Sequence, residues 1–140
     1  MSHAPVPQAS FDLLHLAARG LAAAALHVGP DPAAVGERYA EAHLAALRAA
    51  SAILAARARP ARVRRGPSSV WTLLPEVAPE LVEWSAFFAA GAGKRAAAEA
   101  GLPVVSTREA DDLLRDATHF LALVETTLGL DHQVTLPLTG

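Results

Sequence analysis

The hydrophobic positions along this chain recur at intervals of three and four residues, which is the period of an amphipathic α-helix. The clearest stripe would form the buried face of a helix over 106–129. It consists of Ala110, Leu113, Leu114, Ala117, Leu121, Val124 and Leu128. The motif STRE at 106–109 predicts the start of this helix, because Ser106 and Glu109 can form a capping box. Gly129 is expected to end it.

Turn residues divide the rest of the chain into three further long helices. The first is predicted over 11–28 with Ser10 as a candidate N-cap. The second is predicted over 32–58, since Asp31 followed by a proline is a typical N-cap and first helical position. The third is predicted over 79–101. The pattern therefore indicates long helices joined by short turns.

One short apolar segment lies between the second and third long helices. The sequence SVWTLL at 69–74 predicts a short helix that packs through Trp71. In the third helix, Leu81, Trp84, Phe88 and Ala92 recur at helical spacing, and Trp84, Phe87 and Phe88 are expected in the core. We therefore expect an all-α fold, an up-and-down bundle of four main helices with a short extra helix between the second and third.

The composition agrees with a single helical domain. The chain has 140 residues, of which 52% are hydrophobic and only 5% are aromatic, so alanine, leucine and valine must build most of the core. We expect the bundle to occupy residues 10–129, with a flexible N-terminus over 1–9 and a C-terminal tail over 130–140.

Charge and residue usage exclude several functional classes. The net charge is −2 and there is no cysteine, so the whole chain lacks a nucleic-acid-binding charge balance and has no thiolate metal site. The six histidines are scattered, and we expect no metal and no cofactor. The apolar stretch over 13–28 is interrupted by Arg19 and two histidines and is expected to be too short to span a membrane. A cytoplasmic protein without membrane contact is expected.

The stretch RYAEAH at 38–43 contains the first candidate site. Five residues turn a helix by about 500°, so the side chains of Arg38 and His43 would lie roughly 140° apart. In one interpretation Arg38 is a surface residue paired with Glu41, and His43 lies at a packing boundary. In the other, Arg38 and His43 are catalytic residues that a dimer or a distorted helix brings to one phosphate. The pattern leaves both interpretations open.

Clustered arginines form the second candidate site. Arg59, Arg62, Arg64 and Arg65 follow the second helix without an intervening acid and could bind phosphates. Alternatively, these cations are solvated at a helix C-terminus, where the helix dipole favours them. In GAGKR at 91–95, Lys94 and Arg95 form a possible second patch, and the two glycines are expected to permit a close helix crossing or a bend.

Four segments together resemble the HEPN superfamily (higher eukaryotes and prokaryotes nucleotide-binding). They are RYAEAHLAALRAASAILAAR, SSVWTLL, KRAAAEAG and STREADDLLRDATHFLALVETTL, and the resemblance covers about 31–129. It implies an up-and-down bundle that commonly forms dimers. Many members are metal-independent endoribonucleases in which an Arg-x(4–6)-His motif from each subunit meets at the dimer interface. Others lack this motif and bind nucleotides or other proteins.

The residues and the resemblance lead to one expectation with two alternatives. We expect a HEPN-like domain, as a homodimer, that binds nucleotide or RNA phosphates without catalysis. The first alternative is a metal-independent endoribonuclease in which Arg38 stabilises the phosphate and His43 transfers protons. The second is a helical module for dimerisation or for binding a protein partner.

Overall fold

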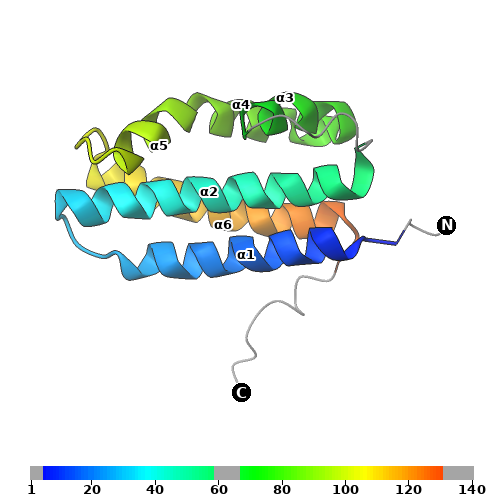
Figure 1. Ribbon diagram of the computed structural model, residues 1–140, viewed down its shortest axis with the longest axis horizontal. Helices are drawn as coiled ribbons and strands as arrows, with labels where there is room; N and C mark the ends of the chain where they lie inside the picture. Colours follow the sequence, from blue (N-terminus) through cyan, green and yellow to red (C-terminus); the bar gives the residue numbers. More distant parts are fainter. Residues whose placement is uncertain (1–4, 59–66, 131–140) are drawn as a thin grey trace, which may run out of the picture.

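The protein is an all-α bundle. The computed structural model describes residues 5–58 and 67–130, and in these ranges it contains helices and no strand. The elements are α1 (Gln8–Leu26), α2 (Pro32–Arg57), α3 (Pro67–Val77), the 3-10 turn η2 (Pro79–Leu81), α4 (Val82–Ala90), α5 (Ala92–Glu99) and α6 (Thr107–Thr127). α1, α2, the α3–α5 layer and α6 run alternately up and down the bundle (Figure 1). The predicted fold class is therefore confirmed.

Helix α2 lies at the centre of the bundle and packs against α1, α3, α5 and α6 (Figure 1). Neighbours on several sides bury most of its faces, and many of the buried positions are alanines. The alanines without solvent exposure are Ala42, Ala49, Ala50 and Ala52. Small side chains let neighbouring helices approach α2 closely, which explains how a core with few large residues can still be well packed.

Most of the aromatic residues gather in one cluster between α3, α4 and α6. Phe88 lies at its centre, with ring centroids 5.2 Å from Trp71 and 5.0 Å from Phe120. Trp84 also belongs to the cluster, with its ring centroid 5.5 Å from that of Phe120. The prediction that Phe88 belongs to the core is confirmed, since it has no solvent exposure, whereas the same prediction for Phe87 was wrong, because Phe87 is 47% exposed. These contacts fix the α3–α4 layer on the rest of the bundle.

Two predicted helix starts are confirmed by their hydrogen bonds. The Asp31 carboxylate accepts a hydrogen bond from the main-chain N–H of Ala34 at 3.4 Å, at the start of α2. Ser106 and Glu109 form the complete capping box of α6, with bonds of 3.0 and 2.9 Å. Both starts were visible in the sequence because capping depends on residues within one turn of each other.

The predicted start of the first helix was wrong. α1 begins at Gln8 after Pro7, so part of the segment expected to be flexible is helical. Ser10 is buried inside the first turn, and its hydroxyl donates a 2.7 Å hydrogen bond to the carbonyl of Ala52 in α2. Ser10 therefore connects two helices and does not act as an N-cap.

The predicted third helix is divided at Gly91, one of the glycines expected to permit a close crossing or a bend. α4 ends at Ala90 and α5 begins at Ala92, and the Gly91 N–H donates to the carbonyl of Phe88 at 3.0 Å. A Cβ atom at Gly91 would lie 2.9 Å from the hydroxyl oxygen of Tyr39. The absence of a side chain at this position therefore allows Tyr39 of α2 to approach the α4–α5 junction.

The length and hydrophobicity of helix α1 differ from the expectation that this segment is too short to span a membrane. Its 19 residues are long and apolar enough to span a membrane by length and composition alone, so the argument that this stretch is too short was wrong. In the bundle, one face of α1 packs beside α2 and α6 through Leu14, Ala17, Leu21 and Ala24. Only 28% of this apolar window is buried inside the bundle.

Candidate functional site

Arg38 lies in the interior of the bundle and not on its surface. Its side chain is 4% exposed, one terminal nitrogen donates a hydrogen bond to the carbonyl of His27, and Nε is 3.0 Å from a carboxylate oxygen of Asp111. The contact with Asp111 is an ion pair without hydrogen-bond alignment at Nε. The expected pair with Glu41 was wrong, because the Glu41 carboxylate is 2.6 Å from Nε2 of His27. Arg38 therefore joins the α1–α2 connection to α6.

His43 is fully buried on another side of α2. Its Nε2 is 2.7 Å from the carbonyl oxygen of Phe88, which can only accept, so this nitrogen carries the proton. Nδ1 is buried without a hydrogen-bond partner. Burial lowers the pKa of His43, the Phe88 carbonyl opposes this effect, and the nearby Arg95 lowers the pKa further. His43 is therefore held as a neutral imidazole.

The structure does not bring Arg38 and His43 to a common site. Arg38 faces the α1–α2 connection and α6, whereas His43 packs against Trp71 and Phe88, with ring centroids 6.2 and 5.9 Å away. Neither side chain offers a free polar group to solvent at the surface of α2, because both are buried. The burial and contacts of Arg38 and His43 are therefore those of structural residues in the folded core.

Lys94 belongs to a polar cluster that was not recognised as such in the sequence. Its Nζ is 2.6 Å from Glu109 of α6, and this hydrogen bond raises the pKa of Lys94. The hydrogen bonds from Lys94 and from the main chain of Ser106 lower the pKa of Glu109. Burial raises the pKa of the Tyr39 phenol, the Lys94 charge lowers it, and the Glu109 charge raises it. The cation of Lys94 is thus already compensated by a carboxylate.

Arg95 is less accessible than expected from its place at the end of GAGKR. Its side chain is 14% exposed, and Nε lies 3.8 Å from the Glu99 carboxylate one helical turn later. Nε is also buried without a hydrogen-bond partner. Lys94 and Arg95 are therefore neighbours in the chain, but each faces a different carboxylate, and they do not form an open cationic patch.

The arginine-rich segment begins where α2 ends. Arg57, the last residue of α2, donates hydrogen bonds to the carbonyls of Val77 at 3.2 Å and Thr127 at 2.9 Å. These carbonyls lie at the C-terminal ends of α3 and α6, where a cation is electrostatically favoured. The four predicted phosphate-binding arginines that follow, Arg59, Arg62, Arg64 and Arg65, lie outside the described residues.

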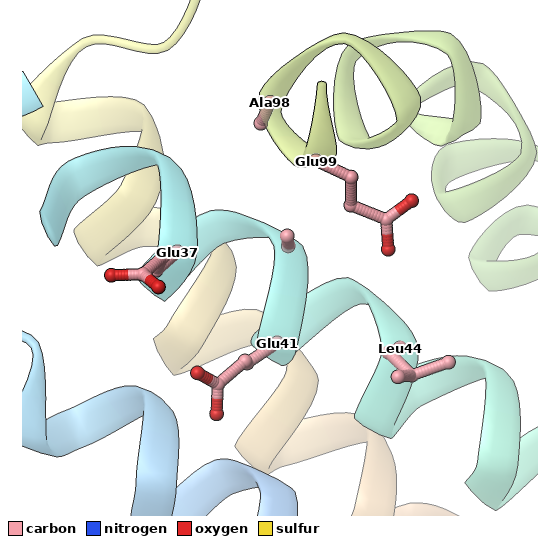
Figure 2. A pocket seen from close by; sticks show the side chains of 6 residues that line it. Glu37, Glu41, Leu44, Ala98 and Glu99 are labelled. Atoms are coloured by element: carbon pink, nitrogen blue, oxygen red, sulfur yellow. The ribbon is translucent and has the colours of Figure 1, made fainter. Parts of the chain in front are cut away.

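Several pockets open on the surface near the start of α2. One, of about 320 Å³, is lined by residues that include Arg38, Asp111 and Thr107. Two more, of about 280 and 590 Å³, lie along the junction of α2 and α5 and share Glu37, Ala98 and Glu99. Figure 2 shows Glu37 and Glu41 on α2, with their side chains directed away from α5, and Glu99 on α5. No group of three potential metal ligands occurs in residues 5–58 and 67–130.

The all-α bundle agrees with a HEPN domain, because HEPN domains are helical. The SAV_6107-like HEPN family model matches residues 33–125, and the chain therefore belongs to this HEPN family. The matched region begins in α2 and ends in α6, so it does not include α1. No curated protein and no solved structure matches the chain significantly.

Proposed function

We propose that this protein is a HEPN domain that binds nucleotide or RNA phosphates without cleaving RNA. The observation that carries the absence of catalysis is the environment of His43. The side chain is fully buried, and its only protonated nitrogen is engaged by the Phe88 carbonyl. An acid–base residue must come within hydrogen-bonding distance of the substrate, about 2.6–3.2 Å.

A dimer partner would not remove this obstacle. A partner subunit could supply a second Arg–His pair, but it could not reach an imidazole that is fully buried and packed against Trp71 and Phe88. The guanidinium of Arg38 is also already engaged, by a hydrogen bond to the His27 carbonyl and an ion pair with Asp111. Ribonuclease activity by Arg38 and His43 would therefore require helix α2 to separate from helix α4.

Phosphate binding is supported by the charge density after α2. Arg59, Arg62, Arg64 and Arg65 fall within seven residues that contain no acid, on a chain whose net charge is −2. Lys94 and Arg95 are less suitable, because Glu109 and Glu99 lie within 2.6 and 3.8 Å of them. We therefore narrow the proposed phosphate site to the segment that follows Arg57.

The test is fluorescence anisotropy with labelled single-stranded RNA at several salt concentrations, in excess EDTA. The triple variant Arg62→Ala/Arg64→Ala/Arg65→Ala is compared with Arg19→Ala/Arg108→Ala/Arg115→Ala, which removes the same charge from exposed positions. We expect only the first variant to weaken binding and to reduce the salt slope by about 2. Equal binding by both variants and the wild type would refute the phosphate site.

The same reactions report on catalysis. We expect intact RNA after incubation with the wild-type protein. Metal-independent cleavage by the wild type that is lost in His43→Gln would show that His43 is catalytic and that the buried geometry is not the active one.

A further inference from the structure

The outer face of helix α1 carries apolar side chains that the bundle leaves exposed. α1 lies at the edge of the bundle, with α2 and α6 on one side of it (Figure 1). The stripe that packs inside the bundle consists of Ser10, Leu14, Ala17, Leu21 and Ala24. Outside this stripe, Phe11, Leu16 and Leu26 are 41%, 40% and 80% exposed. A helix that is apolar well beyond its packed stripe is expected to contact a second surface.

A second stripe runs along α1 beside the packed one. Its positions follow one another at alternating intervals of four and three residues, as in the seam of a coiled coil. All of them are exposed: Phe11, His15, Ala18, Ala22 and Ala25. The alanines leave room for another helix to approach closely, and the ring of Phe11 can fill the space beside them. The stripe therefore has the form of one half of a helix–helix contact.

The charges beside this stripe indicate what the other half is. Asp12 and Arg19 are exposed and seven residues apart, so they lie on the same side of α1 and about 10.5 Å apart along its axis. Asp12 accepts a hydrogen bond of 3.0 Å from the uncharged amide of Gln8. Within residues 5–58 and 67–130, neither Asp12 nor Arg19 has an ion-pair partner. A negative and a positive charge at this spacing are complementary to a second α1 that runs in the opposite direction.

An antiparallel pair of α1 helices satisfies the charges and the apolar stripe in the same register. When the two helices cross between residues 15 and 16, Asp12 of each copy lies level with the partner's Arg19, which gives two equivalent ion pairs. Phe11 of each copy then lies level with residue 20 of the other, and thus between the partner's Ala18 and the partner's Ala22. A parallel pair in register would instead place like charges side by side.

We propose that the outer face of α1 binds a second copy of this chain, through an antiparallel α1–α1 contact with an Asp12–Arg19 ion pair at each end. This surface is different from the interface that the HEPN resemblance implies. That interface joins Arg–His motifs, whereas Arg38 and His43 are buried on α2. The surface also lies outside residues 33–125, which the family model matches. No residue of the contact belongs to the arginine-rich segment, so the proposal is independent of phosphate binding.

Sedimentation velocity of the full-length chain over a range of concentrations tests the contact. We expect a monomer–dimer equilibrium in the wild type. Asp12→Arg and Arg19→Asp should each weaken dimerisation about tenfold or more, because each change turns two attractive pairs into two repulsive ones. An equimolar mixture of these two variants should dimerise about as tightly as the wild type, since opposite charges then face each other again.

The apolar stripe is tested by Ala22→Glu, which introduces a charge at an exposed position and should also weaken the dimer about tenfold. The matched controls are Arg108→Asp on α6 and Ala86→Glu on α4, which make the same kinds of change at exposed positions elsewhere. Both controls should dimerise as the wild type does. Circular dichroism confirms that each variant remains folded.

Three results would overturn the proposal. The first is a wild-type chain that stays monomeric at every concentration up to about 1 mM, including one that instead binds phosphatidylcholine vesicles through α1. The second is a dimer whose affinity is unchanged in Asp12→Arg, Arg19→Asp and Ala22→Glu, since another surface would then join the two copies. The third is an equimolar mixture of the two charge variants that stays monomeric. None of these results depends on RNA binding, so failure of this proposal is distinguishable from failure of the phosphate site.

Discussion

The imidazole of His43 and the main-chain carbonyl of Phe88 are joined by a 2.7 Å hydrogen bond between α2 and the last turn of α4. The Phe88 carbonyl lies three residues before Gly91, where the helix is interrupted. His43 thus occupies a structural position, because it is a second donor, besides the Gly91 N–H, to a main-chain acceptor at a helix break. This hydrogen bond is the main reason to regard His43 as a structural residue and not as a catalytic one.

Replacing His43 should therefore reduce stability. We expect His43→Ala to lower the free energy of unfolding by about 2–4 kcal/mol, because it leaves a cavity among Trp71 and Phe88 and removes one of two donors to the Phe88 carbonyl. Urea unfolding followed by circular dichroism measures the change. A loss below about 0.5 kcal/mol would show that the buried hydrogen bond is not formed in solution.

The pH dependence of stability should reveal the same residue. The pKa of His43 in the folded protein is lower than its ordinary value of 6.5, so the unfolded chain binds the proton more readily. Its contribution to stability is therefore complete above about pH 6.5 and is lost as the pH falls towards the folded pKa, with a slope of at most about 1.4 kcal/mol per pH unit. Urea unfolding between pH 5 and 7.5 should show this slope in the wild type and a smaller slope in His43→Gln.

The contact between Gly91 and Tyr39 predicts a coupled pair of substitutions. Gly91→Ala should lower the free energy of unfolding by about 1–3 kcal/mol, because the new methyl group would lie 2.9 Å from the Tyr39 hydroxyl. In a Tyr39→Phe background the same change should cost little, since the clashing oxygen is absent. A double-mutant cycle measures the coupling, and strictly additive effects would contradict the close approach.

Substitutions of Arg38 and Asp111 should lower the free energy of unfolding by different amounts, with the larger loss at Arg38. Arg38→Ala should lower the free energy of unfolding by about 2–3 kcal/mol, because a 4% exposed side chain and its bond to the His27 carbonyl are lost. Asp111→Asn should cost about 1 kcal/mol, since Asp111 is 59% exposed and partly solvated. Chemical unfolding of both variants provides the comparison, and a larger loss in Asp111→Asn would contradict the proposed role of Arg38.

Local features of the fold were predictable, whereas the surroundings of the candidate site were not. The pattern placed α6 correctly because its apolar stripe and its capping box depend on residues within one or two turns. On α2 the same method failed, since it placed Arg38 on a solvated face. Alanine is compatible with buried and exposed positions alike, so a helix rich in alanine gives a weak indication of which face is covered.

The sequence by itself determined that this chain is an all-α bundle, where α2 and α6 begin, and that it resembles HEPN domains. Tertiary structure alone decided that His43 meets Phe88, that Arg38 meets Asp111, and that Glu37 of α2 and Glu99 of α5 line one pocket. The physical reason is the range of the interactions. Caps and stripes are set by neighbours within a helix, whereas these contacts join residues on different helices and form only when the bundle packs.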